Sequence, residues 1–152
     1  MSGAIVCGAV TAGAFIGMEG VAWSAHKYLM HGWLWTLHRD HHRKDHGGFF
    51  ERNDFFFLIF AIPGVLGLLF GVMHGFTWLF WAGLGVTLYG MAYFLVHDVF
   101  IHQRFRLFRH TDNRYFRAIR RAHKMHHRHP GKEDGECFGM LWVPWNLLRK
   151  KS

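Results

Sequence analysis

The sequence predicts an all-α integral membrane helical bundle with about three to four transmembrane helices and a cytoplasmic histidine-rich metal site. Three observations lead to this prediction: basic and apolar residues are segregated along the chain, long stretches carry no charge, and ten histidines form a repeated pattern. The length of 152 residues leaves room for one domain, which we expect to cover residues 1–152.

Basic residues are confined to two blocks of the chain. All 18 Lys and Arg residues lie within residues 27–52 and 104–151, although 51% of the residues are hydrophobic. Positive residues collect in the cytoplasmic loops of membrane proteins, so both blocks are expected in the cytoplasm. The second block adjoins a predicted span. This favours anionic lipid head groups or an acidic electron-transfer protein as its partner, and we expect no nucleic acid.

Uncharged stretches predict the transmembrane helices. Residues 55–96 contain no formally charged side chain, and as helix they would extend about 63 Å at about 1.5 Å per residue, twice a bilayer core. A break at residues 73–77 divides this stretch in two. A third, Gly- and Ala-rich stretch suits close helix packing. The expected spans are residues 3–25, 55–72 and 77–97, and residues 138–148 are a candidate for a fourth, re-entrant or interfacial segment.

Residues 113–127 are expected to form an amphipathic helix with Asp112 or Thr111 as its N-cap. Its apolar and histidine positions share one face, and its basic positions occupy the others. The histidines therefore continue the buried stripe. The residues of that stripe are Phe116, Ile119, His123, His126 and His127.

Ten of the 14 histidines form a pattern that occurs twice, an HxxxxH box followed by an HxxHH box. Each half begins at the predicted cytoplasmic end of a span, and five ligands per half suit a pair of metal ions. The candidate ligands are His26, His31, His38, His41 and His42 in the first half and His97, His102, His123, His126 and His127 in the second.

The two kinds of box differ in helical geometry. The HxxHH spacing brings three imidazoles to one face of a regular helix. Five residues instead turn an α-helix by about 140°, so HxxxxH requires a π-type distortion, a helix end, or a different metal for each histidine. Imidazole binds several transition metals. Because no acid, base or nucleophile stands out, we expect iron and dioxygen activation, with zinc as a substitute in purified protein.

Carboxylates are expected to accept hydrogen bonds from the ligand imidazoles. Glu19 lies two helical turns before His26 on the same face, and a carboxylate in an apolar span is a functional candidate. The expected partners are Glu19, Asp40, Glu51, Asp54 and Asp98. The histidines outside the boxes, expected at the surface or in turns, are His46, His74, His110 and His129.

The segments around the boxes resemble the bacterial β-carotene 3-hydroxylases of the fatty acid hydroxylase and sterol desaturase superfamily. The boxes by themselves indicate only the superfamily, whereas the segments between them and the short length indicate the carotenoid enzymes. The resemblance runs over residues 17–144 and includes GMEGVAWSAHKYLMHG at 17–32, LHRDHH at 37–42, GFFERND at 48–54, YFLVHDVFIHQRF at 93–105, RAHKMHH at 121–127 and GKEDGECFG at 131–139.

This resemblance implies a non-haem diiron monooxygenase of the bacterial inner membrane, with all ten box histidines as ligands. It would use dioxygen and a ferredoxin-type electron donor to hydroxylate carbon 3 of carotenoid β-ionone rings. β-Carotene would yield β-cryptoxanthin and then zeaxanthin, and canthaxanthin would yield astaxanthin. The alternatives are a fatty acyl or sterol hydroxylase or desaturase, and a non-enzymatic membrane metal-binding protein. The sequence leaves open whether the protein is a monomer or a homo-oligomer.

Overall fold

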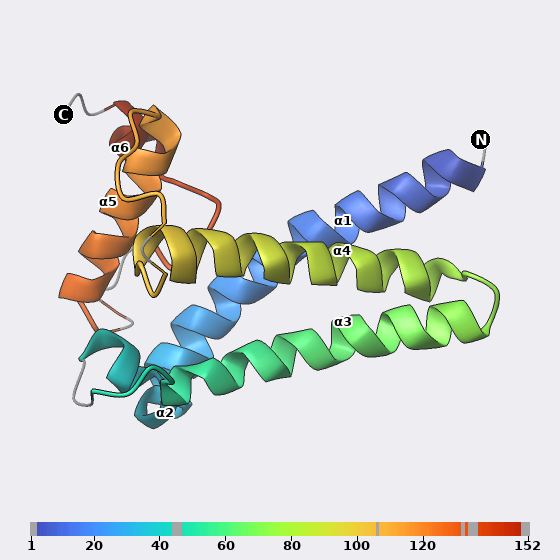
Figure 1. The fold of residues 1–152 in the computed structure, drawn as a ribbon, viewed down its shortest axis with the longest axis horizontal. Coiled ribbons are helices and arrows are strands. Elements are labelled where there is room, and N and C mark those ends of the chain that lie inside the picture. Colours follow the sequence, from blue (N-terminus) through green and yellow to red (C-terminus); the bar gives the residue numbers. More distant parts are fainter. Residues whose placement is uncertain (1–2, 44–46, 106, 132, 134–136, 150–152) are drawn as a thin grey trace. The chain divides into compact units, whose positions relative to one another are not determined.

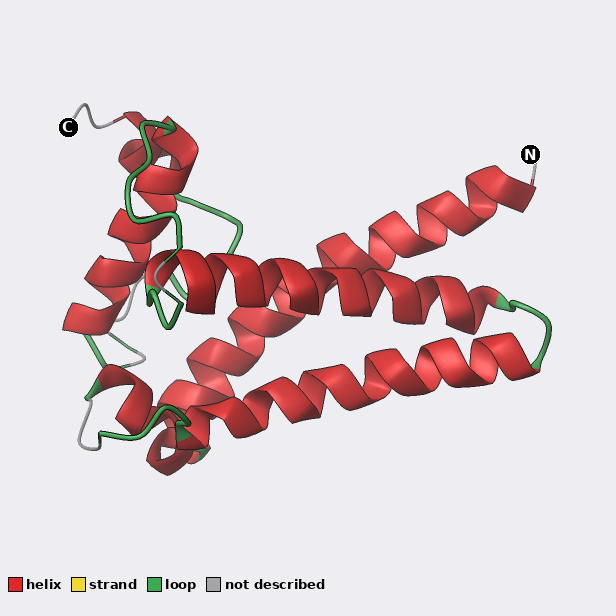
Figure 2. Cartoon of the chain, in the orientation of Figure 1, coloured by secondary structure: helices red, strands yellow, loops and turns green. Residues whose placement is uncertain are grey.

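The computed structural model describes residues 3–43, 47–105, 107–131, 133 and 137–149. All the regular secondary structure among these residues is helical (Figure 2), as the all-α prediction requires. Three helical stretches are long and apolar enough to cross a membrane, and they confirm the three predicted spans. Their bounds are Gly3–Trp33, Arg52–Met73 and Trp78–Ile101.

Two compact units make up the chain, each assembled from two separate stretches of sequence. The span unit comprises Met1–Met18 and Asp54–Ala92. The histidine unit comprises Glu19–Asn53 and Tyr93–Ser152. That residues 1–152 form a single domain therefore stays a prediction.

The span unit contains α3 (Phe55–Met73), most of α4 (Trp78–Phe94) and the first part of α1 (Gly3–Ser24). Helices α3 and α4 run antiparallel as a hairpin (Figure 1). The turn between them has Gly75 and Phe76 at positive φ, 80° and 59°. The predicted break at residues 73–77 is therefore confirmed.

Large apolar side chains lie on the outside of these helices. Ile16 is 70% exposed and Met73 is 74% exposed. Exposure of such surfaces to water is unfavourable, whereas in a membrane the hydrocarbon of the bilayer covers them. The exposure therefore agrees with helices that are surrounded by lipid.

Glycines allow the backbones of the span unit to approach closely. A Cβ on Gly83 of α4 would lie 2.7 Å from the backbone nitrogen of Leu68 on α3. Side chains at Gly71 and Gly85 would likewise collide with the backbones of Phe80 and Thr11. Lipid tails are as apolar as leucine, so close van der Waals contact of this kind drives helix association in membranes.

Helix α1 is fixed to α4 by one polar and one aromatic contact. The Thr11 hydroxyl lies 3.1 Å from the carbonyl oxygen of Trp81, to which it donates. The Phe15 and Tyr89 rings pack edge to face with centroids 5.6 Å apart. These contacts and the glycines hold the three span helices together.

The histidine unit consists of short helices around a small apolar core. Two of its elements are π-helical, and each directly follows a span helix in the chain: η1 after α1, and η3 after α4. Its elements are η1 (Ala25–Trp33), α2 (Trp35–His42), the 3₁₀ turn η2 (Arg52–Asp54), η3 (Leu95–Ile101), α5 (Arg114–Arg128) and α6 (Trp145–Arg149). Its apolar core is Ala118, Ile119, Ala122, Val143 and Leu147.

The N-cap predicted for α5 is wrong by one or two residues. Asn113 caps the helix, and its Oδ1 accepts from the backbone N–H groups of Tyr115 and Phe116 at 2.9 and 3.2 Å. Its extended backbone, with φ −66° and ψ 122°, directs the side chain over the first helical turn. Thr111 instead accepts from the N–H of Asn113.

The face predicted for α5 is buried except at its start. Ile119, His123 and His126 are buried as expected, and His127 is partly buried. Phe116 is 37% exposed because it lies in the first turn, where its ring packs against Phe100 at 5.2 Å between centroids. The histidines therefore do belong to the buried stripe.

Residues 138–148 form no additional membrane-crossing helix. The segment has no regular structure until the short α6, and its Val143 and Leu147 pack against α5. Trp142 and Trp145 are 77% and 66% exposed. The described residues therefore contain three candidate spans, and the interfacial position of this segment stays a prediction.

We predict that Gly83→Ala destabilises the span unit by about 1–3 kcal/mol, because its new methyl group would overlap the backbone of α3. Gly90→Ala on the same helix is the control, since nothing lies within 4 Å of a Cβ there. Unfolding of the detergent-solubilised protein measures both. Equal stability of the two variants would show that the close α3–α4 approach is not required.

Candidate metal centre

The two π-helices bring the histidines of each HxxxxH box together. Their hydrogen bonds connect residues five apart, as from the His102 N–H to the His97 carbonyl at 2.9 Å. The rings of His26 and His31 then lie 5.0 Å apart and those of His97 and His102 lie 4.5 Å apart, measured between centroids. Of the three geometries that the spacing left open, the π-type distortion is confirmed.

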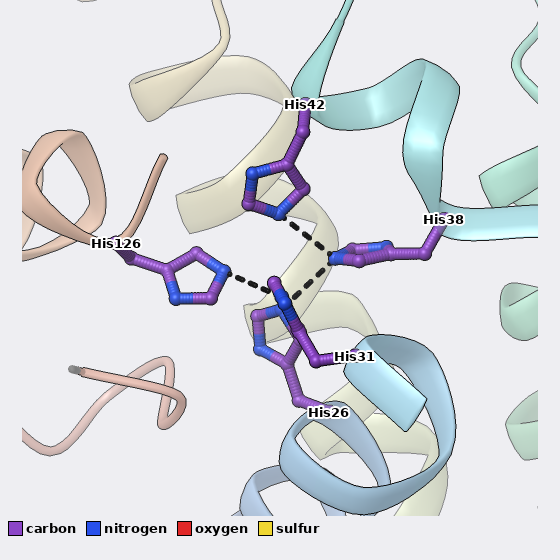
Figure 3. A group of neighbouring side chains, drawn as sticks. All are labelled: His26, His31, His38, His42 and His126. Carbon is purple, nitrogen blue, oxygen red and sulfur yellow. Dashed lines mark hydrogen bonds between the residues drawn. The ribbon is translucent and has the colours of Figure 1, made fainter. Parts of the chain in front are cut away.

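Nine of the ten box histidines form two groups. Within each group, the potential ligand atoms all lie within 4.8 Å of one another. Figure 3 shows the first of them, with five rings from three segments of the chain directed toward a common centre. The first histidine group is His26, His31, His38, His42 and His126, and the second histidine group is His41, His97, His102 and His123.

The groups do not follow the two halves of the sequence, which corrects the expectation of five ligands from each half. His126 joins the first-half histidines, and His41 joins those of the second half. Helical rotation explains the exchange. Positions i and i+4 of HxxHH are about 40° apart and stay together, whereas i+3 and i+4 are about 100° apart and diverge.

The tenth box histidine, His127, lies beside both groups. Its Nε2 is 2.8 Å from the Nε2 of His123, which belongs to the second group. Its ring stacks on His42 of the first group with centroids 4.3 Å apart. All ten box histidines therefore belong to one continuous cluster.

Five of these imidazoles direct Nδ1 at an oxygen that accepts a hydrogen bond. A backbone carbonyl, a carboxylate or the oxygen of a side-chain amide can only accept, so the proton is on Nδ1. The Nδ1 atom of His26 donates to the Phe138 carbonyl (2.9 Å), His31 to the Pro130 carbonyl (2.6 Å), His38 to Asn53 Oδ1 (2.6 Å), His41 to Glu51 Oε2 (2.8 Å) and His97 to Asp98 Oδ2 (3.1 Å).

This arrangement leaves Nε2 lone pairs facing one another. The Nε2 atoms of His26 and His38 are 3.2 Å apart, and those of His41 and His97 are 3.1 Å apart. With both protons of a pair on Nδ1, neither Nε2 can donate to the other, and the lone pairs repel. A cation between them removes the repulsion, so the donor set fits bound metal.

Burial lowers the pKa of four histidines that lie outside the span helices. Loss of hydration lowers the pKa of His38 to about 3 and that of His127 to about 4. Burial, and then the neighbouring histidines, hold the pKa values of His41 and His123 well below the usual range. Near pH 7 these imidazoles are therefore unprotonated and can act as ligands.

The predicted carboxylates occupy different positions around the cluster. Asp98 lies where expected, accepting from His97, and it also accepts from Arg104 at 2.9 Å. Asp40 is buried and accepts from the Arg52 backbone N–H at 2.7 Å, which fixes the loop that carries Glu51 and Asn53.

The other two predicted carboxylates are Asp54 and Glu19. Asp54 ends the η2 turn, and its role stays a prediction. Glu19 accepts from backbone N–H groups near the C-terminus, beginning at Met140. These contacts form because the C-terminal segment lies against that part of α1. A hydrogen bond from a ligand imidazole to Glu19 stays a prediction.

Some partners of the ligands carry no clear signal in the sequence. Glu51 is an expected partner, and its contact with His41 confirms that expectation. Asn53 of the same segment, GFFERND, was not expected, although an amide close to HxxHH could have suggested it. The carbonyls of Phe138 and Pro130 could not be found this way, because every residue has a carbonyl group.

The histidines outside the boxes are peripheral where the structure describes them. His74 is exposed, and its Nδ1 donates to the Phe70 carbonyl within the same turn region. His110 and His129 are also exposed. His46 lies outside the described residues.

Comparison with known proteins gives a consistent set of relatives. The fatty acid hydroxylase family model matches residues 11–150. The β-carotene hydroxylase of Pantoea ananas is 44% identical over 130 residues, which cover 85% of this chain and 73% of that protein. The β-carotene hydroxylase of Pseudescherichia vulneris is 42% identical over 131 residues, covering 84% and 72%.

A plant protein is similar over a longer part of this chain. The chloroplastic β-carotene 3-hydroxylase of Gentiana lutea is 42% identical over 144 residues, which cover 91% of this chain and 43% of that protein. No solved structure matches this chain significantly.

We predict that His42→Ala and His126→Ala each lower the metal content of the chain, because both residues belong to the first histidine group. Elemental analysis of the purified protein measures the content. His74→Ala should retain the metal content of the unchanged chain, since His74 is exposed and hydrogen-bonded to its own helix. Undiminished metal in both group variants would contradict the grouping.

Glu51→Gln should weaken metal binding at the second histidine group about 10–100-fold, because the carboxylate orients His41 and increases its basicity. Competition with a chelator measures the affinity. Asp112→Asn, at an exposed acid next to α5, is the matched control. An affinity equal to that of the control would show that Glu51 does not support the ligand.

Proposed function

This chain belongs to the fatty acid hydroxylase family, and we propose that it is a β-carotene 3-hydroxylase. It hydroxylates carbon 3 of the β-ionone ring and converts β-carotene to β-cryptoxanthin and then to zeaxanthin. The observation that carries this proposal is a cluster of ten buried and partly buried histidines in a chain that is 42–44% identical to bacterial β-carotene hydroxylases over most of its length.

The proposed cofactor is a pair of non-haem iron ions, one for each histidine group. The two groups and their neutral imidazoles support this choice, since a structural zinc site needs only four ligands. Bound iron would supply the activation of dioxygen and the insertion of one oxygen atom into a ring C–H bond. A ferredoxin-type protein would provide two electrons, and zinc can replace iron in purified protein.

The residues of the chain hold the ligands in place and exclude water. The oxygen atoms that accept hydrogen bonds from Nδ1 prevent rotation of the rings and keep Nε2 directed toward the centre of each group. The Phe138 ring is buried and packs on His126 with centroids 5.1 Å apart. An apolar ring in this position protects one side of the centre from solvent.

Several of the proposed ligands lie near the ends of membrane spans, where a substrate dissolved in the bilayer could reach them. His26, His31 and His97 all lie in the last turns of candidate membrane spans. The outward apolar side chains of the span unit are compatible with a carotenoid in the surrounding lipid. Canthaxanthin, whose rings carry a 4-keto group, would lead to astaxanthin in the same reaction.

The proposed location is the inner membrane of a bacterium with the centre facing the cytoplasm. Both basic blocks, residues 27–52 and 104–151, contain or adjoin box histidines. Positive loops remain in the cytoplasm, so the histidines would be accessible there to a soluble electron donor. Hydroxylation of the second ring requires release and rebinding, or a second protomer in a homo-oligomer.

We predict that Escherichia coli cells that make β-carotene accumulate zeaxanthin when they express this chain. His41→Ala and His126→Ala should abolish the product, because each removes a ligand from a different histidine group. His74→Ala should form zeaxanthin as the unchanged chain does. Chromatography of extracted pigments measures all four.

The same experiment separates the related activities. A fatty acyl or sterol hydroxylase or desaturase would leave β-carotene unchanged and alter cellular lipids instead. A membrane metal-binding protein without enzymatic activity would change neither pool. Either result, with the protein present in the membrane, would refute the proposed function.

A further inference from the structure

Glu19 is bound to a distant segment of the chain by three hydrogen bonds to one oxygen atom. Its Oε1 accepts from the backbone N–H groups of Met140, Leu141 and Trp142 at 2.9, 2.9 and 2.8 Å. These residues belong to a segment without regular structure, residues 138–142, which we call the C-terminal strap. The carboxylate thus fixes the strap against the end of α1.

The strap contacts the first histidine group directly. Its Phe138 carbonyl accepts from His26 Nδ1 at 2.9 Å. Its Phe138 ring is only 3% exposed and packs on His31 and His126, with centroids 5.2 and 5.1 Å apart. The position of the strap therefore determines both an orienting hydrogen bond and an apolar wall of this group.

Glycine at position 139 leaves room for the carboxylate beside the strap. A Cβ on Gly139 would lie 2.8 Å from Glu19 Oε1. On its other side the strap is bonded to α5, where the Tyr115 hydroxyl donates to the Leu141 carbonyl at 2.6 Å. Two independent contacts thus hold the strap between α1 and α5.

A carboxylate suits this position better than an amide. Hydrogen bonds from N–H groups to an ionised oxygen are about twice as strong as neutral ones. A carboxylate in an apolar span is also costly unless it is well bonded, so its presence indicates a function. A glutamine here would lose the charge, and its NH2 group, which carries two donors, would replace the other carboxylate oxygen.

We propose that Glu19 is a positioning residue that acts on the first histidine group through the strap. By clamping residues 138–142 it holds the Phe138 carbonyl on His26 Nδ1, and this keeps His26 Nε2 directed at the metal. The inference rests on the proposed function, because it assumes that the histidine groups hold iron. It adds that Glu19 supports one of the two metal positions.

Release of iron from the purified full-length chain tests this inference separately from catalysis. The protein is loaded anaerobically with iron(II), and an iron(II) chelator is added in excess. Glu19→Gln and Gly139→Ala should each release one of the two irons about 10–100-fold faster than the unchanged chain, while the other iron leaves at the original rate. Gly47→Ala, a glycine with open space around its Cβ, is the control for the added methyl group.

The number of irons that become labile distinguishes the outcomes. Faster release of one iron in Gly139→Ala supports the inference even if Glu19→Gln does not fold, because the new methyl group separates the strap from the carboxylate and leaves the charge of Glu19 unchanged. Equal acceleration of both irons would reduce Glu19 to a general stabiliser of the fold, and unchanged release of both would remove its link to the centre. If the unchanged chain binds no iron, the proposed function fails, and this inference fails with it.

Discussion

Imidazole nitrogens that carry lone pairs repel one another at hydrogen-bond distance, and this constraint determines much of the histidine unit. The Nε2 atoms of His41 and His97 are held 3.1 Å apart although Glu51 and Asp98 place both protons on the opposite nitrogens. Burial lowers the pKa of His41 and so opposes its protonation. The surrounding backbone therefore maintains an arrangement that becomes favourable when a metal ion lies among the rings.

Features that depend on spacing and charge could be predicted from the sequence. The uncharged stretch over residues 55–96 required two spans, and the five-residue interval between His97 and His102 required a departure from α-helical geometry. Both follow from fixed dimensions, the thickness of a bilayer and the rotation per residue. The structure has the two spans and a π-helix at this interval.

Features that depend on contacts between distant segments could not be predicted in the same way. The exchange of His41 and His126 between the histidine groups depends on how α2 and α5 face each other. The bond from His26 to the Phe138 carbonyl joins residues 112 apart and leaves no mark on side-chain chemistry. Glu19 was recognisable as a costly carboxylate, but its partners are backbone N–H groups that any residue provides.

X-ray absorption at the iron edge of the iron-loaded full-length chain tests the central claim most directly. The claim is that the ten histidines hold two irons in adjacent groups. The account predicts imidazole nitrogens as the main ligands and a second iron as a near neighbour of each absorbing iron. Isolated iron without a metal neighbour, or iron bound mainly by oxygen, would contradict it.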